Sequence, residues 1–244
     1  MPRFFVTEEN IREDKIFICG EDAYHIARAL RMAVGESVTV SDGKGEEYIC
    51  HLTTIRDELC ECCIESRRHS DSEPPVRITL FMAYPKGDKL ELVIQKAVEL
   101  GAERIIPFES SRCIKRPKKE KAEKTTARLQ RIADEAAKQC GRAILPKVGE
   151  CVDYKEMLRL AGESDVSLFC YEAEDDGLIS RVLPGKRGAK SISVIVGSEG
   201  GFSPEEAEAA KEAGLTPVNL GPRILRCETA PMYALAAISY QLEL

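Results

Sequence analysis

The pattern of apolar and polar positions in residues 1–70 is that of short strands. Short segments rich in apolar and β-branched residues occur at 4–6, 15–19, 37–41, 47–54 and 58–64, and turn signals such as Ser41-Asp-Gly-Lys-Gly45 separate them. One helix is predicted over residues 22–30, because Ile26, Ala29 and Leu30 share a face. The pattern predicts a small β-barrel.

The pattern changes after the polar, proline-containing segment at residues 70–75. Apolar runs of strand length at 77–84, 104–108, 166–171, 191–196 and 217–220 alternate with helical segments at 88–100 and 119–140, a helix that starts at Ser203-Pro-Glu-Glu206, and a last helix from residue 229. Such alternation is typical of an α/β domain with a mostly parallel sheet. We therefore expect two domains, at residues 1–72 and 73–244.

Composition places the chain among ordinary globular proteins. Its 244 residues are 43% hydrophobic and 31% charged, which excludes wholesale disorder and allows a core without disulfides. No apolar run approaches the roughly 20 residues of a membrane span, and the first ten residues lack a signal-peptide core. We expect a cytoplasmic protein with no membrane partner.

The ten cysteines do not form a recognised metal motif. No pair has CxxC spacing, and the cluster of Cys60, Cys62 and Cys63 near His51 and His69 matches no structural zinc pattern. Small apolar strand positions are the simpler interpretation. We predict reduced cysteines and no metal site.

Charge is unevenly distributed along the chain. The formal net charge is −6, yet residues 112–131 contain nine basic residues and two acidic ones. This segment is typical of a phosphate-contacting surface. The alternative is a solvated helix face with pairs such as Glu120 and Lys124.

Two glycine-containing loops follow predicted strands of the second domain. They cover residues 196–202 and 220–230, and the second contains Arg223, Arg226 and Glu228. Ligands of open parallel sheets bind at the carboxyl ends of the strands, where glycines allow close backbone approach. GxGxxG, P-loop and GxSxG motifs are absent, which argues against dehydrogenases, ATPases and hydrolases.

These loops resemble those of the RsmE family, in the SPOUT class of S-adenosylmethionine-dependent RNA methyltransferases. The resemblance rests on Gly197-Ser-Glu-Gly-Gly-Phe-Ser203 and Leu220-Gly-Pro-Arg-Ile-Leu-Arg-Cys-Glu-Thr-Ala230, with support from Pro85-Lys-Gly-Asp-Lys89 and Gln139-Cys-Gly-Arg142. Ser198 stands where the family usually has proline, and Cys227 stands where it usually has threonine.

The resemblance implies a trefoil-knotted α/β domain after a PUA-like β-barrel that docks RNA. It also implies a homodimer, S-adenosylmethionine as cofactor with S-adenosylhomocysteine as product, and 16S ribosomal RNA or the small ribosomal subunit as partner. The implied reaction is methylation of N3 of a uridine.

The resemblance also assigns roles to residues. Glu228 or Glu199 would be the general base, and Arg226, or Arg223, would stabilise negative charge. The alternative is that Arg226 and Glu228 form only a local ion pair. The expected cofactor-binding residues are Leu168, Tyr171, Gly197, Glu199, Gly200, Gly201, Leu220, Gly221, Ile224, Leu225, Cys227 and Ala230. The expected RNA-binding residues are Arg3, Arg28, Arg31, Arg112, Lys115, Arg116, Lys118, Lys119 and Arg223.

Two alternatives remain open from the sequence. One is a related knotted methyltransferase that acts on another RNA or on a ribose 2′-hydroxyl. The other is a non-catalytic RNA-binding or ribosome-assembly factor that uses the barrel and the basic segment.

Overall fold

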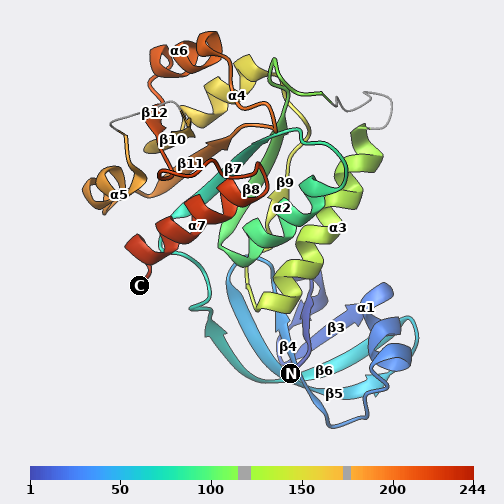
Figure 1. Ribbon diagram of the computed structural model, residues 1–244. Coiled ribbons are helices and arrows are strands. Elements are labelled where there is room, and N and C mark those ends of the chain that lie inside the picture. The colour runs from blue at the N-terminus through green and yellow to red at the C-terminus, as the bar shows by residue number, and fades with distance from the viewer. Residues whose placement is uncertain (115–121, 173–176) are drawn as a thin grey trace. The chain divides into compact units, whose positions relative to one another are not determined.

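The computed structural model describes residues 1–114, 122–172 and 177–244 (Figure 1). Its chain forms two compact units. The first comprises Met1–Glu73 together with Ala137–Leu145, and the second comprises Pro74–Ala136 and Pro146–Leu244. The domain boundary expected after residue 72 assigns residues 137–145 to the second domain, whereas in the structure they belong to the first unit.

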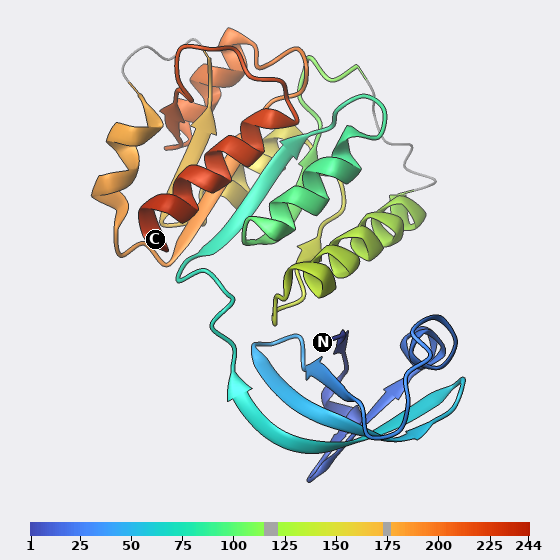
Figure 2. The same ribbon diagram turned by 60° about the horizontal axis from the view of Figure 1, so that its bottom comes forward.

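A curled sheet forms the body of the first unit (Figure 2). Its strand order is β1-β4-β5-β6-β3-β2, and only β1 and β4 pair in parallel. The strands are β1 (Arg3–Phe5), β2 (Ile11–Arg12), β3 (Lys15–Cys19), β4 (Ser37–Ser41), β5 (Glu46–Ile55) and β6 (Leu59–His69). The long pair β5 and β6 contains two register shifts, which increase local twist and allow the sheet to curl.

Alternate residues of these strands build the core of the first unit. Ile16 and Ile18 of β3, Val38 and Val40 of β4, and Cys60 and Cys62 of β6 are all buried. Cys63 is exposed, as strand alternation requires. The three clustered cysteines therefore do not share a face, and no group of metal-ligating side chains occurs among the described residues.

The helix expected at residues 22–30 is divided in the structure. Helix α1 (Glu21–Tyr24) continues into a π-helical turn, η2 (His25–Ala29), in which Leu30 N–H bonds to His25 O. Ala23 and Ile26 bury this segment against the sheet. A short 3₁₀ turn, η1 (Glu8–Asn10), lies between β1 and β2.

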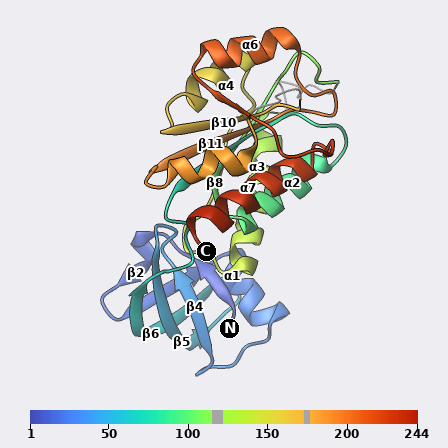
Figure 3. The same ribbon diagram turned by 60° about the vertical axis from the view of Figure 1, so that its left-hand side comes forward.

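A fully parallel sheet forms the second unit. Its order is β12-β10-β11-β7-β8-β9. The strands are β7 (Arg77–Ala83), β8 (Ala102–Phe108), β9 (Lys147–Val148), β10 (Val166–Cys170), β11 (Ser191–Val196) and β12 (Thr216–Val218). Buried residues fill β10 and nearly all of β11, because helices cover both faces of the sheet (Figure 3).

The helices of the second unit are α2 (Lys89–Glu99), α4 (Tyr154–Ala161), α5 (Ile179–Val182), α6 (Pro204–Glu212) and α7 (Thr229–Leu242), with the 3₁₀ turn η4 (Leu183–Lys186). Helix α3 (Ala122–Cys140) starts in this unit and ends in the other. Helices α2 and α7 pack side by side, and α7 also contacts β11, whereas α4 contacts β7 and β11. The loops after the neighbouring strands β10, β11 and β12 meet at one edge, because the strands are parallel.

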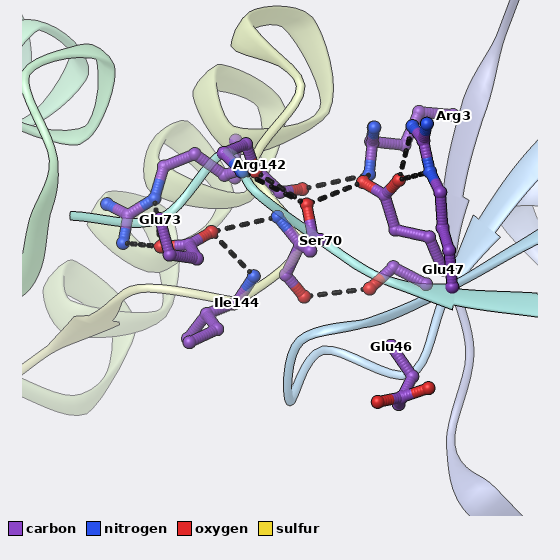
Figure 4. A network of polar contacts seen from close by, with 12 residues as sticks. Arg3, Glu46, Glu47, Ser70, Glu73, Arg142 and Ile144 are labelled. Carbon is purple, nitrogen blue, oxygen red and sulfur yellow. Dashed lines mark hydrogen bonds and ion pairs between the residues drawn. The ribbon is translucent and has the colours of Figure 1, made fainter. Parts of the chain in front are cut away.

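A polar network joins the segment 137–145 to the sheet of the first unit (Figure 4). Glu47, with 1% of its side chain exposed, accepts from Arg3 Nη1 at 2.6 Å and from Ser70 Oγ at 3.0 Å. Glu73 accepts from Arg142 Nη2 at 2.6 Å and from the N–H groups of Ala143 and Ile144 at 2.9 and 3.0 Å. These contacts fix a loop far along the chain against the first 73 residues.

Candidate functional site

A cleft of about 380 Å³ lies at the carboxyl ends of β10, β11 and β12. All of its lining residues belong to the second unit. They are Lys89, Cys170, Tyr171, Glu172, Val196, Gly197, Ser198, Glu199, Gly201, Phe202, Val218, Asn219, Leu220, Gly221, Arg223, Ile224, Leu225, Arg226, Cys227 and Ala230. The volume and the mixture of apolar and charged side chains suit a small-molecule ligand.

Glycines bring the loop after β11 close to its neighbours. Gly201 has φ +62, and a Cβ there would lie 2.7 Å from Oε1 of Glu172. A Cβ on Gly197 would lie 3.2 Å from backbone atoms of Gly201. The loop therefore presents backbone directly to the cleft.

The loop after β12 is fixed by local hydrogen bonds. Gly221 N–H donates to Oδ1 of Asn219 at 2.7 Å, and Gly221 has φ +112. The carbonyl oxygen of Arg226 then accepts from the N–H groups of Thr229 and Ala230 and starts α7. Between these two points, Leu220 and Leu225 contribute apolar surface to the cleft.

Charged side chains from three elements meet at one side of the site. The Nζ of Lys89, the first residue of α2, lies 3.1 Å from Oε1 of Glu199 and 3.1 Å from Oε2 of Glu228. The thiol of Cys227 lies 3.2 Å from Oε2 of Glu228. We call Lys89, Glu199, Glu228 and Cys227 the Lys89 cluster.

The Lys89 cluster shifts the pKa values of its members. Burial opposes ionisation of Glu199, but its own backbone N–H, Lys89 and the Lys86 N–H outweigh it and lower the pKa. The pKa of Glu228 is lowered by its own backbone N–H and, against burial, by Cys227 and Lys89. Both carboxylates are therefore ionised at neutral pH.

The two departures from the family motifs have defined partners. Ser198 is buried, and its Oγ donates to the carbonyl of Arg112 at 3.4 Å, a bond that proline cannot make. Burial, followed by the hydrogen bond to Glu228, raises the pKa of Cys227 to about 12. The thiol at this position is thus neutral and bonded to a carboxylate.

Most of the expected cofactor-binding residues line the cleft. They are Tyr171, Gly197, Glu199, Gly201, Leu220, Gly221, Ile224, Leu225, Cys227 and Ala230. The lining does not include Leu168, which is fully buried within β10. Nor does it include Gly200, where a Cβ would lie 2.9 Å from Cβ of Arg112, so this glycine permits close packing of two loops.

The expected catalytic residues lie together. Glu199 and Arg226 line the cleft, and Glu228 joins them through Lys89. Among the described residues, Arg226 forms no ion pair, and the cation that contacts Glu228 is Lys89. The alternative interpretation, in which Arg226 and Glu228 form only a local ion pair, is therefore not supported.

The expected RNA-binding residues are dispersed. Arg3 has only 13% of its side chain exposed and is bound to buried Glu47, so its guanidinium supports the first unit and is not presented to a ligand. Arg28 forms an exposed pair with Asp57, and Arg31 is exposed with φ +52. Arg223 lines the cleft, and Arg112 donates to the carbonyl of Gly200 at 3.0 Å. Lys115, Arg116, Lys118 and Lys119 lie outside the described residues.

The polar lining residues Lys89, Glu172 and Asn219 were not among the individual cofactor-binding residues expected from the sequence. Lys89 ends the quoted motif Pro85-Lys-Gly-Asp-Lys89, so a signal for it was present. Glu172 and Asn219 each follow the carboxyl end of a strand, which is the position at which ligands of parallel sheets are bound.

Known proteins share both parts of this architecture. The family model described as an RNA methyltransferase domain matches residues 72–239, and the model of an RNA methyltransferase PUA domain matches residues 18–65. Ribosomal RNA small subunit methyltransferase E from Bacillus subtilis is 35% identical, over 100% of this chain and 98% of its own. The protein of the same name from Synechocystis is 32% identical, over 99% of this chain and 78% of its own.

A solved structure has the same fold throughout. The ribosomal RNA small subunit methyltransferase E from Neisseria gonorrhoeae, bound to S-adenosyl methionine, is 33% identical with a TM-score of 0.89 over 98% of this chain and 97% of its own. Likeness at this level over both units confirms the expected fold class, a PUA-like domain before a SPOUT-type α/β domain. The chain therefore belongs to the RNA methyltransferase family that contains ribosomal RNA small subunit methyltransferase E.

Proposed function

We propose that the protein transfers a methyl group from S-adenosylmethionine to N3 of a uridine in 16S ribosomal RNA of the small ribosomal subunit. The observation that carries this proposal is the cleft itself. The two loops that resemble the family motifs converge there with charged groups suited to the reaction, and relatives of the same architecture carry the corresponding name.

The described residues fit the cofactor. Glycine backbone and the apolar side chains of Leu220 and Leu225 offer a surface for the adenosine, and a Cβ at Gly221 would meet no atom within 4 Å, so the cleft is open at that point. When bound, S-adenosylmethionine supplies the electrophilic methyl group. Glu199 and Glu228 provide negative charge near a cationic ligand.

The chain's own residues then prepare the nucleophile. N3 of uridine carries a weakly acidic proton, which must leave before or during attack. Glu228 or Glu199 accepts this proton, since both are ionised at neutral pH. Arg226, or Arg223, stabilises the negative charge that develops on the neighbouring carbonyl oxygens.

Phosphate contacts are proposed for the exposed basic residues of the second unit. Lys124 and Arg131 of α3 are exposed, whereas Arg128 is paired with Glu91. Exposed arginine and lysine side chains without ion pairs bind an RNA backbone at little cost in broken contacts. Arg31 is the proposed contact of this kind from the first unit, and Arg28 is proposed as a second contact, although its exposed pair with Asp57 must open first.

We also propose that the second unit is knotted, that the protein is a homodimer and that it is located in the cytoplasm. The chain returns from edge strand β12 to α7, which packs on β11 and α2 in the middle of the sheet, and this path supports a knotted thread.

Tyr233 and Tyr240 of α7 are 43% and 74% exposed, which supports a subunit interface there, and sedimentation equilibrium tests it. No described helix is long and apolar enough to cross a membrane.

The test is titration calorimetry with S-adenosylmethionine on the wild type and on Gly221→Trp. The wild type should bind, and Gly221→Trp should lose binding while circular dichroism shows that the fold is retained. Gly221→Ala is the control for backbone strain, because any side chain is unfavourable at φ +112. Mass-spectrometric mapping of the methylated atom in small subunits follows. A methyl group on a ribose oxygen or on another RNA would replace the proposed substrate, and a folded wild type without binding would favour a non-catalytic RNA-binding factor.

A further inference from the structure

The first residue of α2 occupies an unfavourable position for a cation. Lys89 begins an 11-residue helix, and the amino-terminal end of a helix carries partial positive charge. The two carboxylates at 3.1 Å offset this repulsion. The contact thus compensates for a lysine that the helix alone would disfavour.

The same carboxylate of Glu199 holds two parts of one turn. Its Oε1 accepts from the backbone N–H of Lys86 at 3.1 Å as well as from the ammonium of Lys89. The turn after β7 is therefore bound to the loop after β11. Through Glu228, the same ammonium also reaches the residue before α7.

The carboxylates of Glu199 and Glu228 both lie 3.1 Å from the same ammonium nitrogen, so they are close to each other and need this cation between them. Without Lys89, Glu199 and Glu228 would repel each other, and one would gain a proton or move away. Charge-assisted hydrogen bonds from one ammonium fix both acids and are stronger than neutral ones. Their side chains are 27% and 17% exposed, so solvent only partly weakens the effect.

We propose that Lys89 is a positioning residue for methyl transfer, whose ammonium holds Glu199 and Glu228 side by side and keeps the proton-accepting carboxylate anionic at the cleft. This inference rests on the proposed function. Lys89 acts through the carboxylates, and the proton of uridine N3 passes to a carboxylate oxygen and not to the lysine.

The other ionisable groups of the cleft determine which ionisation is detected in a pH profile of methyl transfer. Arg223 and Arg226 line the same cleft, and Cys227 stays neutral well above neutral pH, because burial raises its pKa to about 12. Glu172 is the other carboxylate of the lining besides Glu199, and it forms no ion pair with Lys89. A shift of the acidic limb of the pH–rate profile in a Lys89 variant therefore points to Glu199 or Glu228, which are the carboxylates that pair with Lys89.

The experiment compares Lys89→Met and Lys89→Arg with the wild type. Lys96→Met is the matched control, because Lys96 lies on the same helix and pairs only with Glu99 among the described residues. Initial rates of methyl transfer to small ribosomal subunits are measured from pH 4 to 9, so that the range includes the acidic limb set by carboxylates with lowered pKa values. S-adenosylmethionine affinity is measured by calorimetry.

Lys89→Met should lower kcat about tenfold or more. Loss of the ammonium raises the carboxylate pKa values, so the acidic limb should move to higher pH by about one unit. Lys89→Arg should recover most of the lost kcat, and Lys96→Met should match the wild type.

Two results would overturn the inference while leaving the proposed function intact. One is an active wild type with an unchanged kcat and acidic limb in Lys89→Met. The other is a fall in cofactor affinity that accounts for the whole loss of kcat/KM, which would make Lys89 a simple binding contact. A folded wild type that methylates no RNA would refute the proposed function and this inference with it.

Discussion

At the scale of single residues, Cys227 shows how surroundings decide the chemistry of a thiol. Its sulfur is buried beside Glu228, and its pKa is about 12, so the reactive thiolate is scarce at pH 8. Cys19, Cys63 and Cys140 are exposed. Position in the fold thus separates cysteines that the sequence alone does not distinguish.

We predict that iodoacetamide at pH 8 modifies Cys19, Cys63 and Cys140 well before Cys227. Peptide mass spectrometry of a time course measures the order. The unfolded protein in urea is the control, and there all four should react at similar rates. Modification of native Cys227 as fast as Cys63 would contradict the burial described above.

Single residues also differ in how well their place at the cleft could be predicted from the sequence. Gly201 and Gly221 were expected at the cleft because their motifs are specific, and both line it with positive φ. The importance of Lys89 was not foreseen, because its partners Glu199 and Glu228 are far away in the chain. Ion pairs of this kind depend on which loops the fold brings together.

At the scale of elements, the start of α6 carries a signal that the structure reproduces. Ser203 Oγ accepts from Glu206 N–H, and Glu206 Oε2 accepts from Ser203 N–H at 3.0 Å, which forms a capping box. Glu206 has a second function, since its Oε1 accepts from Ser111 N–H at 2.7 Å. One carboxylate therefore starts a helix and fixes the loop after β8.

Glu206→Ala should destabilise the protein by about 2–3 kcal/mol, against about 1 kcal/mol for Ser203→Ala. The glutamate is buried, and its removal leaves two N–H groups without this acceptor, whereas removal of Ser203 Oγ affects one. Urea denaturation gives both values. Exposed Glu208→Ala on the same helix is the control, and equal losses for Ser203→Ala and Glu206→Ala would contradict the second role.

Long buried strands were predictable, and short elements were not. Residues 191–196 and 37–41 form strands as expected, since the first segment is rich in β-branched apolar residues and the second alternates polar and apolar positions. Helix α4 was missed although Asp153 accepts from Glu156 N–H as an N-cap, because only Met157 and Ala161 of its eight residues are buried. The two-residue strand β9 is defined by its pairing with β8 and has no periodicity of its own.

At the scale of the whole molecule, Glu73 holds the loop at residues 141–145 in the first unit. Its carboxylate binds the guanidinium of Arg142, which is 4% exposed, and two backbone N–H groups of the same loop. A boundary after residue 72 was expected from Ser70–Pro75 composition. That the loop at 141–145 belongs with the sheet could not be expected, because nothing in local composition encodes a distant partner.

Glu73→Ala should cost about 3 kcal/mol of stability, because it removes the carboxylate that pairs with a buried guanidinium and that also accepts from the N–H groups of Ala143 and Ile144. Glu163→Ala, which removes an exposed pair with Arg159, should cost less than about 1 kcal/mol. Chemical denaturation measures both. Affinity for S-adenosylmethionine should be unchanged in folded Glu73→Ala, since every residue of the cleft belongs to the other unit, and a weakened affinity would contradict this separation.

The inclusion of residues 137–145 in the first unit has a consequence for the order of synthesis. A nascent chain emerges from its amino terminus, and domains generally fold as they are completed. Here the curled sheet is finished by a segment that emerges only after β7, α2 and β8 of the second unit. A ribosome must therefore translate more than half of this protein before its first-made part has all of its own pieces.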